Sequence, residues 1–165
     1  MSRKWKVVIG WVTAIVIIDQ VTKAIVDRTM PLHDSIPVID GFLNLTYIRN
    51  TGAAFGIFSG SHEGFRLPFL IGVSVLASGF ILVMLNRLRG DATGLATALA
   101  FILGGAIGNL IDRVVYGEVI DFLDVYWSRY HWPAFNVADS FITIGVAITL
   151  FYLIRAKGDD PFAAS

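Results

Sequence analysis

The sequence predicts an α-helical membrane protein with four transmembrane helices, a small extracytoplasmic β-sheet element and a short mobile or amphipathic segment. Hydrophobic residues make up 55% of the 165 residues and charged residues only 16%, whereas an average soluble domain is about 45–50% apolar and roughly 25% charged. Residues 67–85 and 92–111 contain no charged residue. Each stretch is long enough to cross a hydrocarbon core of about 30 Å as a helix.

All 165 residues are interpreted as one integral-membrane domain. The spans are expected at residues 5–26, 67–86, 92–112 and 137–155, separated by outer segments at 27–66 and 113–136. The first span follows basic residues, as a signal peptide does, but no small-residue cleavage site comes after it. We therefore expect it to be an uncleaved helix.

Lysine and arginine near the ends of spans favour the cytoplasmic side of a membrane. The side that we expect to be cytoplasmic carries Arg3, Lys4, Lys6, Arg87, Arg89, Arg155 and Lys157. The opposite side carries Arg28, Arg49, Arg66, Arg113 and Arg129, spread over the two longer segments. This distribution predicts that both termini are cytoplasmic.

The outer segments do not have the pattern of helices. Prolines and glycines interrupt residues 27–66, and residues 42–48 are rich in strand-forming side chains. The turn signal at 50–52 predicts a return strand at 53–58, and residues 118–127 alternate as a further strand. We expect these strands to rest on the outer membrane surface, with 59–66 as a candidate lid. The aromatic side chains expected at the interface are Trp127, Tyr130 and Trp132.

Composition excludes several classes of function. Lys plus Arg and Asp plus Glu number 13 each, so no basic excess remains for binding nucleic acid. The chain has no cysteine, which excludes disulfides, thiolate metal sites and a cysteine nucleophile. It has three histidines without HExxH spacing and no GxSxG motif. No metal and no cofactor are expected.

Carboxylates in or beside a membrane span are costly and are therefore candidates for function. They are Asp19, Asp112, Asp121, Asp124 and Asp139. Asp19 and Lys23 have the i,i+4 spacing of a helical ion pair, for which a structural role is the favoured interpretation. Asp112 lies at the end of its span and is expected to face solvent or Arg113.

Residues 104–108 have a GxxxG spacing, which is typical of close helix packing. Asn109 and Arg113 follow on one helical face. At the outer end of a span they are candidates to orient carboxylates or to hold a substrate carbonyl. The alternative is that they cap the helix, since arginine suits a C-terminal dipole.

Asn136 and Asp139 have the spacing of a capping box at the start of the last span. A capping role does not exclude a catalytic role for Asp139, because a helix N-terminus favours an ionised carboxylate, which can act as a general base. Asp121 lies in an apolar, strand-like stretch where aspartate is disfavoured, so a structural role explains it least well.

Two carboxylates that meet at a membrane surface would share a proton, because like charges a few Å apart do not both ionise easily. The ionised member could then activate water while the other polarises a carbonyl. Asp121 and Asp139 lie on either side of a short link. They converge only if the 121–127 strand folds back over the start of the last helix, which spacing alone leaves open.

Five motifs occur in order along nearly the whole chain. They are Asp-Gln-Val-Thr-Lys at 19–23, Arg-Asn-Thr-Gly-Ala-Ala-Phe at 49–55, Gly-Gly-Ala-Ile-Gly-Asn-Leu-Ile-Asp-Arg at 104–113, Val-Ile-Asp-Phe at 119–122 and Phe-Asn-Val-Ala-Asp-Ser at 135–140. In this order and on four spans, they resemble the bacterial lipoprotein signal peptidase family, also called signal peptidase II, whose members are aspartic membrane proteases.

The resemblance implies a multi-pass endopeptidase of the bacterial inner membrane with its site near the outer face. It implies cleavage of diacylglyceryl-modified prolipoproteins before the lipidated cysteine, contact with membrane lipid and inhibition by globomycin-type peptides. Asp121 and Asp139 would be the catalytic pair. The supporting residues would be Asn50, Gly52, Asn109, Arg113, Asn136, Asp19 and Lys23. Nothing in the sequence demands more than a monomer.

Two alternatives stay open at this point. A small ion- or proton-coupled carrier that uses intramembrane carboxylates would be expected to have broken spans or inverted repeats. The sequence shows neither, and its charges cluster at one membrane face. A non-enzymatic assembly subunit with purely structural aspartates is the other alternative.

Overall fold

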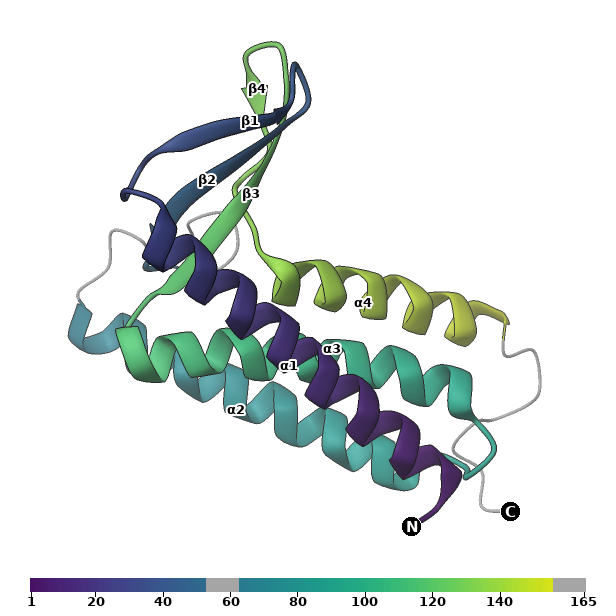
Figure 1. The fold of residues 1–165 in the computed structure, drawn as a ribbon. Coiled ribbons are helices and arrows are strands. Elements are labelled where there is room, and N and C mark those ends of the chain that lie inside the picture. The colour runs from purple at the N-terminus through teal and green to yellow at the C-terminus, as the bar shows by residue number, and fades with distance from the viewer. Residues whose placement is uncertain (53–62, 156–165) are drawn as a thin grey trace.

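The computed structural model describes residues 1–52 and 63–155, and it confirms the predicted fold class. It contains the helices α1 (Arg3–Thr29), α2 (Glu63–Arg87), α3 (Thr93–Tyr116) and α4 (Val137–Arg155). Each is long and apolar enough to cross a membrane. A four-stranded sheet projects from one end of the helical bundle, and the N-terminus lies at the other end (Figure 1).

The helices match the predicted spans except at some of their ends. The first reaches Thr29, beyond the expected residue 26, and α3 reaches Tyr116, beyond the expected residue 112. Gly117, whose φ is +78°, ends α3 in the left-handed conformation, and its N–H donates to the carbonyl of Arg113. Glycine adopts this conformation without the steric cost of a Cβ. The second outer segment therefore begins at Gly117 rather than at residue 113.

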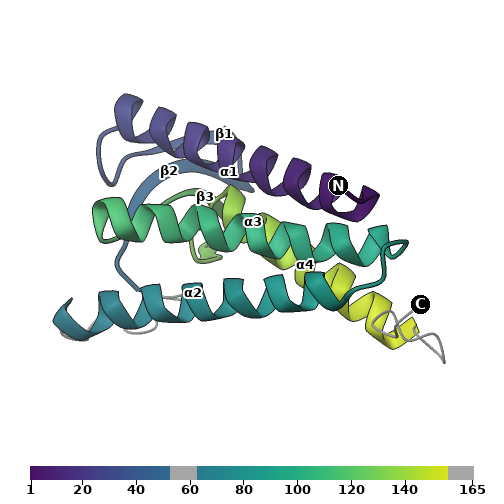
Figure 2. The ribbon, with the colours of Figure 1, turned by 90° about the horizontal axis from the view of Figure 1, so that it is seen from below.

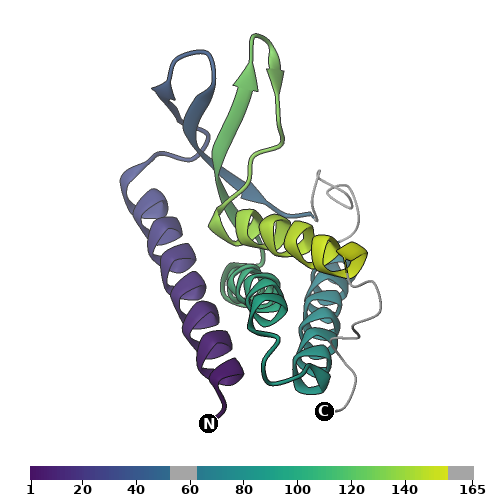
Figure 3. The same ribbon diagram turned by 90° about the vertical axis from the view of Figure 1, so that its right-hand side faces the viewer.

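The central helix of the bundle is α3, which packs against each of the other three helices (Figures 2 and 3). Its glycines permit close approach, as the GxxxG spacing predicts. A Cβ added at Gly104 would lie 3.0 Å from Ile15 Cβ, and one at Gly105 would lie 2.3 Å from the carbonyl oxygen of Ala138. Large apolar side chains on the outer faces, such as Leu76 and Phe80, are exposed, as a lipid environment requires.

The sheet is antiparallel, with the order β1 (Ser35–Ile39), β2 (Leu43–Asn50), β3 (Val119–Trp127) and β4 (Tyr130–His131). The strands predicted at 42–48 and 118–127 are confirmed as β2 and β3. The strands β1 and β4 were not predicted. The return strand expected at 53–58 and the first half of the candidate lid, residues 59–62, lie outside the described residues. The second half of that segment, residues 63–66, forms the start of α2.

A small core joins the sheet to the C-terminal end of α1. It consists of the buried side chains Val26, Met30, Tyr47, Ile120 and Phe122. Nearby, Arg49 Nη2 pairs with Asp27 Oδ1 at 2.5 Å, which adds an ionic contact between β2 and α1. Asn50 at the end of β2 lies opposite Val119, and Ile48 lies opposite Asp121. This register brings the end of β2 beside the start of β3, where the candidate carboxylate lies.

Candidate active site

Asp121 and Asp139 converge at the junction of the sheet and the helical bundle, an arrangement that their spacing in the sequence left open. Asp121 lies near the start of β3, and Asp139 lies in the first turn of α4. Asn136 connects them: its Nδ2 donates to Asp121 Oδ1 at 2.8 Å, and its Oδ1 accepts from the Asp139 backbone N–H at 3.0 Å. A single buried amide therefore fixes one carboxylate and the backbone that carries the other.

Asp121 is buried, with 2% of its surface exposed. Its Oδ2 accepts a hydrogen bond from Asn50 Nδ2 at 2.9 Å, and the Gly52 N–H holds Asn50 Oδ1 at 2.9 Å. Burial and the nearby charge of Asp139 raise the pKa of Asp121 to about 7, against the opposing effect of these amide hydrogen bonds. At neutral pH this carboxyl is therefore able both to hold and to release a proton.

Asp139 is half-buried and keeps its carboxylate at the helix start. Asn109 Nδ2 donates to Asp139 Oδ1 at 2.7 Å, and the Asn136 backbone N–H donates to Oδ2 at 3.3 Å. The bond from the Asn136 N–H to Asp139 Oδ2 and the bond from the Asp139 N–H to Asn136 Oδ1 form a reciprocal capping box. The capping prediction is confirmed, and the same geometry leaves the carboxylate beside Asp121.

Arg113 and Gly52 meet at the edge of this site. Arg113 Nη2 donates to the Gly52 carbonyl at 3.4 Å, and Nη1 donates to the Asn109 carbonyl at 3.4 Å. The long side chain thus joins the turn after β2 to α3. Its half-buried guanidinium acts electrostatically on both Asp139 and Asp121, which places a positive charge beside the pair.

Behind the pair lies a buried ionic cluster. Lys23, with 2% of its surface exposed, pairs with Asp19 at 2.8 Å and with Asp112 at 2.9 Å, which confirms the predicted i,i+4 pair. Its third contact is to Asn109 Oδ1 at 3.0 Å. Asp19 Oδ1 accepts from the Ala138 N–H in the first turn of α4 at 2.9 Å. Asp19 and Lys23 therefore support the groups that hold Asp139.

The expectation that Asp112 faces solvent or Arg113 is wrong. Asp112 is fully buried and faces α1, where it accepts from Gln20 Nε2 at 2.8 Å as well as pairing with Lys23. The expected span ended at residue 112, but α3 continues to Tyr116, so Asp112 lies inside the helix. Spacing could have revealed this position, because Gly104, Gly108 and Asp112 recur every four residues on one face. The sequence analysis also did not identify Gln20 as a partner of Asp112.

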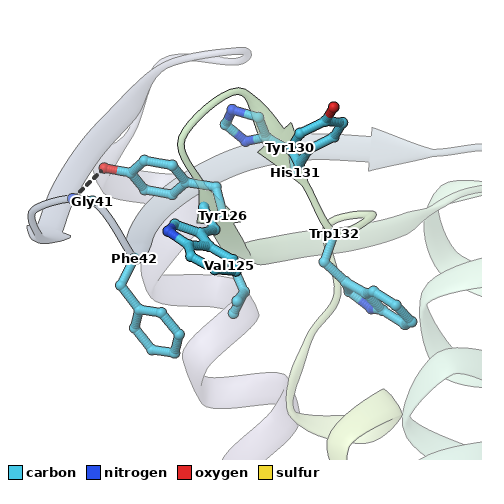
Figure 4. A pocket seen from close by; sticks show the side chains of 8 residues that line it. Gly41, Phe42, Val125, Tyr126, Tyr130, His131 and Trp132 are labelled. Atoms are coloured by element: carbon cyan, nitrogen blue, oxygen red, sulfur yellow. Dashed lines mark hydrogen bonds between the residues drawn. The ribbon is translucent and has the colours of Figure 1, made fainter.

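Asp124 belongs to a different part of the sheet. It accepts from Asn44 Nδ2 at 2.9 Å and contacts His131 Nδ1 at 2.8 Å. Close by, at the far end of the sheet, is an open hollow of about 570 Å³ lined by Gly41, Phe42, Val125, Tyr126, Trp127, Tyr130, His131 and Trp132 (Figure 4). The Gly41 N–H donates to the Tyr126 hydroxyl there. Neither Asp121 nor Asp139 lines this hollow, so it is separate from the candidate active site.

The arrangement is suited to carboxylate chemistry. Within residues 1–52 and 63–155, no three or more histidine and carboxylate side chains are grouped as they would be to hold a metal ion. A protonated carboxyl beside an ionised one can polarise a carbonyl while the other removes a proton from water. Side-chain amides of Asn50, Asn109 and Asn136 donate to the two carboxylates and hold them in place for such a reaction.

Comparisons with known proteins identify relatives of this chain. A profile of the family described as signal peptidase (SPase) II matches residues 11–155. The chain belongs to the signal peptidase II family. It is 54% identical over 157 residues to the lipoprotein signal peptidase of Geobacter sulfurreducens, covering 95% of this chain and 97% of that protein. It is 52% identical over 145 residues to that of Geobacter metallireducens, covering 87% and 88%.

Two solved structures share the fold of this chain. A bacterial membrane enzyme solved by the in meso method at 2.3 Å resolution superimposes with a TM-score of 0.82 at 35% identity, covering 96% of this chain and 93% of that one. A second, solved at 1.9 Å, gives a TM-score of 0.77 at 36% identity, with coverage of 91% and 94%. Family membership identifies the chain as a membrane peptidase, and these matches give the carrier alternative no support.

Proposed function

We propose that this protein is an aspartic endopeptidase that removes the signal peptide from diacylglyceryl-modified prolipoproteins, cleaving before the lipidated cysteine. The observation that carries the proposal is the bridged pair, in which Asn136 holds Asp121 and the start of the Asp139 helix together. The family supplies the substrate class, because its relatives are named lipoprotein signal peptidase.

In the proposed mechanism, ionised Asp139 removes a proton from a water molecule as that water attacks the scissile carbonyl. Protonated Asp121, whose pKa is about 7, donates a hydrogen bond to the carbonyl oxygen. The bond from the water oxygen to the carbonyl carbon forms first. The C–N bond then breaks, and the leaving amine takes a proton from the pair. No covalent enzyme intermediate is needed.

The remaining polar residues are proposed to hold the substrate backbone. Arg113 and Asn109 present donors beside the pair, and the turn at Asn50 and Gly52 lies across from them. An extended substrate segment would run between α3 and this turn. Asp19 and Lys23 are proposed to act through Ala138 and Asn109, which they contact.

The substrate also suggests where the site lies in the cell. A diacylglyceryl group anchors the substrate in the bilayer, so its scissile bond lies near the lipid headgroups. The pair lies on β3 and at the start of α4, and these two elements meet where the sheet joins the bundle (Figure 1). We therefore place the enzyme in the bacterial inner membrane as a monomer, with the sheet at the outer face. Peptides of the globomycin type are proposed to bind the same groups as the substrate.

Two matched prolipoprotein peptides test the substrate class. One carries diacylglyceryl on its lipobox cysteine, and the other carries the same cysteine unmodified. We expect purified enzyme in detergent to cleave the first before the cysteine, as mass spectrometry of the products would show, and to leave the second intact. Cleavage of both at equal rates, or cleavage at another bond, would contradict the proposed specificity.

A further inference from the structure

Asp112 is a buried charge with no part in the proposed reaction. None of its surface is exposed, and both carboxylate oxygens are engaged: Oδ1 by Gln20 Nε2 at 2.8 Å and Oδ2 by Lys23 Nζ at 2.9 Å. Oδ2 also accepts from the Ile120 N–H at 3.2 Å. Burying a carboxylate is costly unless it is paired and hydrogen-bonded, and these partners lead toward the catalytic pair by two routes.

The first route reaches Asp121 through the backbone of β3. Ile120 immediately precedes Asp121, and its peptide groups are held on both sides. Its N–H donates to Asp112, and its carbonyl accepts from Asn136 Nδ2 at 3.2 Å. The Ile120 side chain is also buried in the core that joins the sheet to α1. Asp112 therefore anchors the start of β3 to α3 one residue before the catalytic carboxyl.

The second route reaches Asp139 through side chains. Lys23 contacts Asp112, Asp19 and Asn109, which accounts for the three donors of its ammonium group. Because Asn109 Oδ1 accepts from Lys23, its Nδ2 is left to donate to Asp139 Oδ1 at 2.7 Å. The charge on Asp112 thus helps to keep Lys23 in the position that orients Asn109.

We propose that Asp112 is a positioning residue that sets both catalytic aspartates at once, through Ile120 and through Lys23 and Asn109. Asp19 differs in that its carboxylate bonds the α4 backbone at Ala138 and the α1 side chains of Lys23 and Gln20. The inference rests on the proposed function, since it assigns Asp112 to that reaction. A residue that positions catalytic groups changes the rate of the chemical step more than it changes substrate binding.

The test compares Asp112→Asn with Asp124→Asn, measuring kcat, KM and the melting temperature of each purified variant. Asp124 is a matched control because it is a partly buried aspartate of β3 bonded to Asn44 and His131, away from the pair. We expect Asp112→Asn to lower kcat of the folded enzyme by roughly 10- to 100-fold with little change in KM, because small displacements of reacting groups cost this much. Asp124→Asn should leave kcat and KM unchanged.

A double variant separates positioning from general stability. If Asp112 acts partly through Asn109, Asp112→Asn combined with Asn109→Ala should lose less kcat than the product of the two single losses. Fully additive losses, or an unchanged kcat in folded Asp112→Asn, would overturn the inference. If Asp112→Asn does not fold, Gln20→Leu replaces it. This change removes the bond of Gln20 to Asp112 at 2.8 Å, together with its longer bonds at 3.2 Å to Asp19 and to the Gly108 carbonyl, and keeps every charge. A lowered kcat with retained folding is then expected, and an unchanged kcat would overturn the inference.

Activity of the wild-type enzyme separates this inference from the proposed function. If the wild type cleaves the lipidated peptide but Asp112→Asn retains full kcat, only the inference fails. If the folded wild type does not cleave a peptide whose lipidation is verified, the proposed function fails, and the role of Asp112 in that reaction fails with it.

Discussion

Asp121 occupies a position that an aspartate rarely takes, inside a strand and out of contact with water. Its carboxylate is tolerated because Asn50 and Asn136 each donate a hydrogen bond to it. The balance between these donors and the effects of burial and Asp139 leaves its pKa near 7 rather than near the ordinary 3.8. A general acid works best when its pKa lies near the working pH, so this position is suited to proton transfer.

The pH dependence of cleavage follows from that pKa. Below about 7, Asp121 is protonated and can donate to the scissile carbonyl, and as the pH rises through 7 it loses this proton. We therefore expect kcat/KM to fall on the alkaline side with a midpoint near pH 7, because kcat/KM reports the free enzyme. Rates are compared only where circular dichroism shows an unchanged fold. A kcat/KM that rises from pH 7 to about pH 9 would contradict the assignment of Asp121 as the acid.

Asn136 has two roles that a single substitution would remove together. Asn136→Ala loses the cap of α4 and the bond to Asp121. We expect the free energy of unfolding to fall by about 0.5–2 kcal/mol for the lost cap and kcat to fall by roughly 100-fold for the misplaced pair. Thr149→Ala is the control, because the Thr149 hydroxyl donates to the carbonyl of Gly145 within α4 itself, at 2.8 Å. Equal kcat in the two variants would contradict the bridging role.

At the scale of elements, the small residues of α3 bring the ionic cluster and helix α4 together. A Cβ added at Gly108 would lie 2.6 Å from Asp19 Oδ2 and 3.3 Å from Ala138 Cβ. Gly108 therefore allows Asp19 to reach both Lys23 and the start of α4. Packing of helices and placement of charges are thus set by the same face of one helix.

Gly108→Ala tests this link between packing and site. The added methyl group would displace Asp19 or spread the helices, at a cost of about 1–3 kcal/mol in the free energy of unfolding, and kcat should fall with it. Gly79→Ala in α2 is the matched control, because a Cβ there meets nothing within 4 Å. Thermal unfolding in detergent compares the two. Similar melting temperatures for both variants would contradict the account of α3 packing.

The sequence predicted some elements better than others, for physical reasons. The four spans lack charged residues over long stretches, and the two long strands are rich in β-forming side chains. All six elements were predicted, and the structure contains them. The strand β1 was missed because it is short, contains Pro37 and is exposed at every residue, so it lacks a buried alternating pattern. Asp112 was misplaced because an Asp-Arg pair looks like a helix end, while Gly117 sets the true end of α3.

The contacts within the site were predictable only in part. Local spacing predicted the ion pair of Asp19 with Lys23 and the capping box of Asn136 with Asp139, and both are present. Contacts between distant segments, such as Ala138 with Asp19 and Ile120 with Asp112, depend on how helices and strands pack. No periodicity along one segment carries that information.

At the scale of the whole molecule, the orientation in the membrane is the main prediction. The sheet extends beyond one end of the bundle, and the loop between α2 and α3 lies at the other (Figure 3). Because the chain has no cysteine, single cysteines can report each side. We expect Asp40→Cys, in the exposed turn between β1 and β2, to react with a membrane-impermeant maleimide in spheroplasts. Asp91→Cys, exposed between α2 and α3, should react only after lysis.

The reverse labelling pattern would show the opposite orientation and place the proposed catalytic pair at the cytoplasmic face. Labelling of both sites after lysis is the control for reactivity of each cysteine. Retained cleavage by both variants shows that the labelled proteins are native. A site at the cytoplasmic face would contradict the proposal that the enzyme works on lipidated substrates at the outer surface.

The central claim is that Asp121 and Asp139 act together as the catalytic pair, and single substitutions test it most directly. Cleavage of a diacylglyceryl-modified prolipoprotein by purified wild type is compared with Asp121→Asn and Asp139→Asn, each shown to be folded by its melting temperature. Asparagine keeps the size of each side chain but cannot exchange the proton. We expect each variant to lose roughly 10²–10⁴-fold in kcat. A folded variant that cleaves at the wild-type rate would remove its residue from the chemistry and contradict the account.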